Sequence, residues 1–163
     1  MSRRLFGATF VLSILAGCAA PNPRIKTKLN DAAMLVGSIP VDPLRWNAIT
    51  SRVNRHDATF SILFGNDAAV RHSRTNASHD YPTGSVIAFV TWHQQEDIRW
   101  FGGQIPAAAK SVEFVSVESG EQGRPSVAYE VYEGSPLKKT SLADDRANSR
   151  VAFLLSQRAA GMP

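Results

Sequence analysis

The sequence contains a single cysteine, Cys18, among its 163 residues, and this scarcity excludes several kinds of protein. One thiol cannot form a disulfide within the chain, and a metal site built from several cysteine ligands is excluded for the same reason. Neither sign of charge is in large excess, because 18 lysines and arginines stand against 14 aspartates and glutamates. Because the basic residues are scattered and form no stripe, we expect no nucleic-acid partner.

No apolar run reaches the length of about 20 residues that spans a bilayer, but a shorter run lies near the N-terminus. Arg3 and Arg4 precede an apolar stretch that ends in Leu15-Ala16-Gly17-Cys18. This order is typical of a signal peptide. The last four residues resemble the bacterial lipobox, in which the chain is cut before the cysteine and the cysteine is acylated. We therefore predict a lipoprotein signal peptide over 1–17 and lipidation of Cys18.

The residues around Cys18 predict where the lipid anchor resides. Ala19 and Ala20 lack the aspartate that holds many lipoproteins in the inner membrane, so we expect the outer membrane, on its periplasmic side. Several acyl chains such as palmitate make a durable anchor, because a single chain binds membranes only marginally. The segment Ser2–Phe6 also resembles part of a twin-arginine export signal, although the general export route fits these residues equally well. An ordinary secretory signal with a chance cysteine is the remaining alternative.

Composition divides the rest of the chain into a tether and one domain. Four prolines and several basic residues mark 18–43 as a lipid-anchored tether, which makes the membrane a partner of the protein. We place a single domain over 44–163. The chain without residues 1–17 has 146 residues and a net charge of +2, and this length suits one domain with its own core.

Hydrophobic periodicity predicts an α+β fold with a mainly antiparallel sheet. Alternating apolar residues predict strands over 59–64, 85–93, 112–118 and 127–132, and residues 44–54 are irregular or strand. The strand over 85–93 is apolar on both faces, so we expect it to be central or to lie at a subunit interface. Strands in series with helices at the ends favour an antiparallel rather than a doubly wound arrangement.

Two helices complete the predicted fold. Asn66 or Asp67 caps a short helix from Ala68 to about Arg74, directly after the first predicted strand. A C-terminal helix follows Ser141, which forms a capping-box pattern with Asp144. Its apolar residues recur at helical spacing, and glycine and proline end it. These residues are Val151, Leu154, Leu155 and Ala159.

Three segments resemble the cytochrome P460 family over roughly residues 45–160. They are "FGNDAAV" (64–70), "YPTGSVIAFVTW" (81–92) and "SVEFVSVE" (111–118). The resemblance implies a mostly antiparallel β fold. Family members are often dimeric, so a homodimer is among the partners that it allows. Haem-bearing members oxidise hydroxylamine or bind small gases such as nitric oxide.

The haem-attachment motif of the family is missing from this sequence. In haem-bearing members a Cys-x-x-Cys-His motif near the C-terminus attaches the cofactor, and its histidine is the axial ligand. Residues 138–163 contain neither cysteine nor histidine. We therefore expect no covalent haem and no other cofactor, and no catalytic residue of the family can be assigned to this chain.

The segment from Thr91 to Gly103 is the richest candidate site in the sequence. A histidine with carboxylates could act as an acid/base pair or hold a metal, and aromatic side chains could line the bottom of a ligand pocket. The simpler interpretation is a strand end and a loop, in which Trp100 and Phe101 fill the core while the charged residues face water. The candidate pocket residues are Trp92, His93, Glu96, Asp97, Trp100 and Phe101. The spacing of the four histidines is not typical of metal sites, so we predict no metal.

Three functions from different classes remain open. The preferred one is a non-enzymatic envelope lipoprotein whose cytochrome P460-like domain binds a small ligand or an envelope partner. The alternative is a protein that binds haem or a metal non-covalently, through His93 or another histidine, in redox chemistry or gas sensing. The third is an enzyme that uses the cluster from His93 to Asp97. Hydrolase and nucleotide-binding motifs are absent from the sequence.

Overall fold

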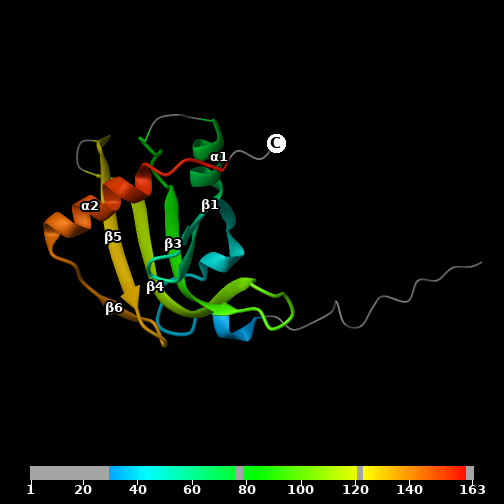
Figure 1. Ribbon diagram of the computed structural model, residues 1–163. Helices are drawn as coiled ribbons and strands as arrows, with labels where there is room; N and C mark the ends of the chain where they lie inside the picture. Colours follow the sequence, from blue (N-terminus) through cyan, green and yellow to red (C-terminus); the bar gives the residue numbers. More distant parts are fainter. Residues whose placement is uncertain (1–29, 76–78, 121–122, 161–163) are drawn as a thin grey trace, which may run out of the picture.

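The domain is built on one antiparallel sheet whose strands follow each other in chain order (Figure 1). The computed structural model describes residues 30–75, 79–120 and 123–160. Each strand pairs with the next in antiparallel register, which confirms the predicted α+β class with an antiparallel sheet. The six strands are β1 (Asn47–Asn54), β2 (Thr59–Gly65), β3 (Val86–Glu96), β4 (Gln104–Ser119), β5 (Pro125–Glu133) and β6 (Lys138–Thr140).

Strand β3 lies inside the sheet and is buried on both faces, as its sequence predicts. Ala88 and Val90 point to one face, and Ile87 and Phe89 point to the other. Alternation along a strand gives each face its own set of side chains. Each face therefore has its own hydrophobic core.

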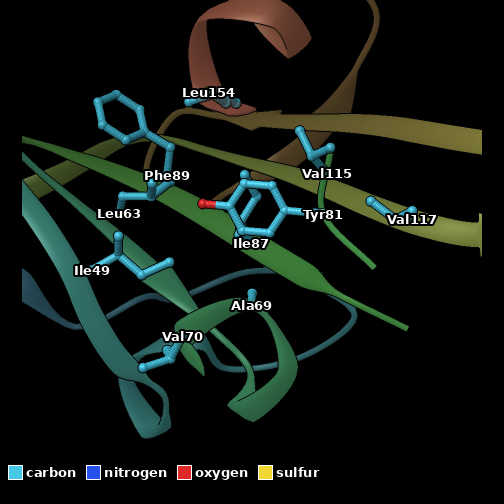
Figure 2. Close-up of a cluster of buried hydrophobic side chains, with 10 residues drawn as sticks. All are labelled: Ile49, Leu63, Ala69, Val70, Tyr81, Ile87, Phe89, Val115, Val117 and Leu154. Carbon is cyan, nitrogen blue, oxygen red and sulfur yellow. The ribbon is translucent and has the colours of Figure 1, made fainter. Parts of the chain in front are cut away.

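Two helices cover the face that contains Ile87 and Phe89 (Figure 2). The first is α1 (Asp67–Thr75), and the side chain of Asn66 caps it by accepting a hydrogen bond from the backbone N–H of Ala69 at 3.0 Å. The second is α2 (Asp144–Leu155), which crosses the sheet in Figure 1. Leu154 of α2 is fully buried among the side chains of β3 and β4.

The ends of α2 differ from the predicted ones. The capping box is wrong, because the helix begins at Asp144 after an extended Ala143 and no side chain caps it. Asp144 and Asp145 instead place negative charge in the first turn, where the helix dipole favours it. The helix ends at Leu155, and beyond it the backbone N–H of Ala160 donates to the carbonyl of Ile49 at 2.9 Å.

The N-terminal part of the described chain covers the other face of the sheet. It contains the short helices η1 (Asp31–Ala33) and η2 (Pro43–Arg45), and its Leu35 and Ile39 pack onto the core of this face. Gly37 pairs with Leu137 at a φ of +143°, where an added Cβ would meet the carbonyl oxygen of Leu137 at 2.3 Å. Residues 30–43 of the predicted tether therefore lie on the domain. The rest of that segment, 18–29, and the predicted signal peptide lie outside the described residues.

Strands β3 and β4 extend beyond the other strands as a two-stranded arm. Strand β2 ends its pairing with β3 at the Thr59–His93 pair, and β5 ends its pairing with β4 at the Ser111–Glu133 pair. Beyond these pairs β3 and β4 pair with no other strand of the described chain, and they continue to pair with each other as far as Glu96 and Gln104. Residues 97–103 form the tip of this arm.

Candidate functional site

The structure separates the six residues of the candidate pocket instead of gathering them. The side chain of Trp92 is only 3% exposed and stacks on Phe60 in the core, with ring centroids 6.2 Å apart. Its indole Nε1–H donates to the carbonyl of Ala33 at 2.8 Å. His93 and Glu96 are exposed along the arm. Trp92 therefore holds the N-terminal segment on the sheet and is buried in a core, whereas the residues of the tip lie outside it.

Asp97 has a structural role at the start of the tip. Its carboxylate accepts hydrogen bonds from the backbone N–H of Arg99 at 2.9 Å and from the Arg99 side chain at 3.3 Å. These contacts, the backbone N–H first, hold the pKa of Asp97 below its usual value. A carboxylate that is held ionised by its own loop is a turn-forming group and a poor proton donor.

The tip carries three apolar side chains that point into solvent. Trp100 is 74% exposed, and Ile98 and Phe101 are fully exposed. The expectation that Trp100 and Phe101 fill the core is therefore wrong. The arm carries both residues beyond the last pairs that β2 and β5 form with it, and there they stay exposed. Ile98 was not among the predicted site residues, although it lies only two positions before the aromatic pair Trp100 and Phe101.

The histidines do not gather with other ligands in the structure. Across the described ranges, no group of three or more histidine, cysteine, aspartate or glutamate side chains could hold a metal ion. His56 is exposed, and its Nδ1 lies 2.9 Å from Asp57 in the turn between β1 and β2. The ring of His72 packs against Tyr81 with centroids 4.6 Å apart.

A buried polar group between the sheet and α2 was not foreseen from the sequence. Glu113 of β4 is 6% exposed, and Arg150 of α2 binds its carboxylate with two hydrogen bonds, from Nε at 2.8 Å and from Nη2 at 2.6 Å. The hydroxyl of Tyr129 on β5 donates to the same carboxylate at 2.7 Å. A signal did exist, because Glu113 alternates with Val115 and Val117 on the apolar face of its strand.

The partners of Glu113 show that this group is a structural tie. Burial and then the neighbouring carboxylate raise the pKa of Tyr129. The hydrogen bonds to Glu113 raise the pKa of Arg150 above its already high value. The guanidinium also lies over the ring of Phe153, 4.8 Å from its centroid. With both carboxylate oxygens of Glu113 and two guanidinium nitrogens of Arg150 hydrogen-bonded, the group fixes α2 to β4 and β5 and offers no free acid or base.

A shallow depression lies beside α1. Its volume is about 380 Å³, and it is wide open to solvent. The depression lacks the enclosure that is typical of small-molecule sites. It is lined by Ala68, Arg71, His72, Thr75, Pro82 and Thr83.

The residues of this chain do not fit a haem attached through thioether bonds. Such a haem needs cysteines and an axial histidine, and the sequence from Lys138 onwards has neither. The space between the sheet and α2 is filled by other groups. Phe89 and Phe153 meet there edge to face at 6.1 Å, beside the ion pair of Glu113 and Arg150.

An antiparallel meander with helices on one face defines the chain as an α+β domain with two cores. The family model for cytochrome P460 matches residues 42–149, so the chain belongs to the cytochrome P460 family. A search of the curated proteins finds no match. Within the described residues, no helix is long and apolar enough to cross a membrane.

Proposed function

We propose that this chain is a bacterial envelope lipoprotein whose cytochrome P460-like domain is a haem-free binding module. Cys18 carries the lipid, and the domain faces the periplasm from the outer membrane. The observation that carries the proposal is the position of the only thiol. It lies in a lipobox-like segment, 24 residues before the family match begins, where it serves an anchor and is remote from the part of the family that attaches haem.

The packing of the domain supports binding through its surface. Each face of the sheet carries its own core, with Trp92 stacked on Phe60 on one side and Phe89 against Phe153 on the other. Buried side chains in contact leave little room for a ligand between them. The tip of the arm, by contrast, presents apolar side chains to the outside. We therefore favour an envelope partner over a small ligand.

Metabolic labelling of cells that express the full chain tests the anchor. We expect a palmitate analogue to label the wild-type protein and to leave Cys18→Ser unlabelled, because the thiol is the acceptor. Ser13→Ala changes the same apolar run without touching the thiol, so it should keep the label. Undiminished labelling of Cys18→Ser would contradict the lipoprotein assignment.

The mass and the visible spectrum of the same protein test the haem-free state. The chain is expressed in cells that mature c-type cytochromes, and we expect no haem-sized increase in mass and no stoichiometric Soret band. A Soret band without the mass increase would replace the proposal with non-covalent haem binding in redox chemistry or gas sensing. An increase in mass would overturn the haem-free assignment altogether.

A further inference from the structure

The tip of the arm gathers the most exposed large apolar side chains of the described residues. Ile98, Trp100 and Phe101 have larger exposed fractions than any other large apolar side chain in the described ranges. Single exposed apolar residues are common on protein surfaces, but three within four positions form a patch. The patch lies at the tip of a protruding arm. This shape can insert into a lipid bilayer more readily than it can cover a flat protein surface.

The backbone of the tip is hydrogen-bonded within the loop. The N–H of Asp97 donates to the carbonyl of Gly103 at 2.9 Å, and the N–H of Gly103 donates to the carbonyl of Trp100 at 2.8 Å. The N–H of Trp100 donates to the carbonyl of Asp97 at 3.1 Å, and the Asp97 carboxylate accepts from Arg99. A loop that enters lipid must satisfy its own backbone groups, since the acyl chains offer no partners. This loop meets that condition at four of its N–H groups.

The described chain begins beside the arm. The side chain of Asn30 donates to the carbonyl of Pro106 on β4, and η1 lies next to the arm in Figure 1. Twelve positions separate Cys18 from Asn30, so the chain between them spans at most about 40 Å. Phe101 is five positions from Pro106, or about 17 Å along a strand. A membrane that holds Cys18 is therefore within reach of the tip.

We propose that residues 97–103 are a membrane-contact element that inserts Ile98, Trp100 and Phe101 into the interface of the membrane that holds the lipid anchor. The proposal rests on the proposed function, because it takes the position of the membrane from acylated Cys18, and it names a lipid surface as the partner of the module. Tryptophan and phenylalanine favour the level of the headgroups. Arg99 at the centre of the tip is exposed and can reach lipid phosphates from there.

Quenching of tryptophan fluorescence by brominated lipid tests the contact without depending on acylation in cells. The full mature chain, residues 18–163, is produced without acylation, and its only thiol is coupled to a maleimide lipid. The vesicles contain phosphatidylethanolamine and phosphatidylglycerol with brominated acyl chains. Trp100 is the exposed member of three tryptophans, so we expect a loss of roughly a third of the emission. Trp100→Phe keeps the tip apolar and should abolish this loss.

Two further variants separate the tip from general apolar surface. Ile98→Ser/Phe101→Ser keeps the reporter but removes its apolar neighbours, so the quenching should fall by about threefold or more. The matched control is Val53→Ser/Val127→Ser, which changes two exposed valines outside the arm and should leave the quenching unchanged. Circular dichroism verifies that each variant is folded.

The result distinguishes this proposal from the proposed function. Unquenched Trp100 in the coupled wild-type chain overturns the membrane contact, even where labelling in cells shows that Cys18 is acylated. Equal quenching in the wild type and in Ile98→Ser/Phe101→Ser overturns it as well. Quenching of Trp100 together with a failure of labelling at Cys18 supports the contact and refutes the natural anchor.

Discussion

Replacing Arg150 with methionine should destabilise the domain, because Arg150 fixes α2 to the sheet through Glu113. The change removes the two guanidinium hydrogen bonds at 2.8 and 2.6 Å and leaves the carboxylate of Glu113 with the hydroxyl of Tyr129 alone. Glu113 is 6% exposed, so water replaces the lost donors poorly. A buried carboxylate that loses its cation is costly because desolvation is no longer offset.

The size of the effect follows from the exposure of the two partners. Breaking a fully buried pair costs about 3–5 kcal/mol. The side chain of Arg150 is 35% exposed, so solvent screens the pair and can reach part of the space that the guanidinium leaves. We therefore expect Arg150→Met to lower the free energy of unfolding by about 2–3 kcal/mol.

Removing the whole group should restore most of that loss. In Glu113→Leu/Tyr129→Phe/Arg150→Met no charge and no hydroxyl remains to be desolvated, and apolar replacement of a buried pair is often neutral or stabilising. Urea unfolding at pH 7, followed by circular dichroism, measures both variants. Arg146→Met changes an exposed arginine one turn earlier in α2 and should shift the free energy by less than about 0.5 kcal/mol. A triple variant that is less stable than Arg150→Met would refute the reasoning.

Two further predictions concern burial. Leu154→Ala should lower the free energy of unfolding in urea by about 2–5 kcal/mol, because Leu154 is fully buried. Leu44→Ala, at an exposed position, should lower it by less than about 1 kcal/mol. A loss below about 0.5 kcal/mol for Leu154→Ala would contradict the packing of α2. Burial raises the pKa of all three tyrosines, Tyr81, Tyr129 and Tyr132, so absorbance at 295 nm should show tyrosinate in the native protein only above the unfolded value of about pH 10. This contribution to stability is complete below that pH and is lost as the pH rises through the folded pKa values, and a native titration that coincides with that of the urea-unfolded chain would contradict it.

The elements with a strong period were predictable, and those without one were not. Residues 59–64 and 85–93 alternate clearly, and all of them except Ser85 lie in strands of the sheet. β6 has only three residues, all exposed, and its lysines and threonine carry no apolar alternation. The start of α2 was misplaced because Ser141 fits a capping pattern locally, while the chain stays extended as far as Ala143.

The candidate site was only partly predictable, because the role of each side chain depends on whether the fold packs it against another element or leaves it in solvent. The segment around Trp92 and Phe101 was correctly predicted to be rich in aromatic residues. Periodicity does not show, however, that β3 and β4 extend beyond the neighbouring strands β2 and β5. The length of that arm moves Phe101 from the expected core into solvent. The pair of Glu113 and Arg150 was missed for a related reason, since its members are 37 positions apart and meet only once α2 crosses the sheet.

The ion pair of Glu113 and Arg150, which fixes α2 to the sheet, also bears on the proposal that this chain carries no covalent haem. In haem-bearing members of the family the cofactor is attached near the C-terminus. Here Arg150 and Leu154 link the C-terminal helix to β4 through an ion pair and a buried side chain. Protein contacts alone can therefore hold the helix in place, and under the proposed function the domain should fold and remain stable without any cofactor. Residues 97–103 at the tip of the arm belong to neither core, so substitutions there should leave the folded domain intact.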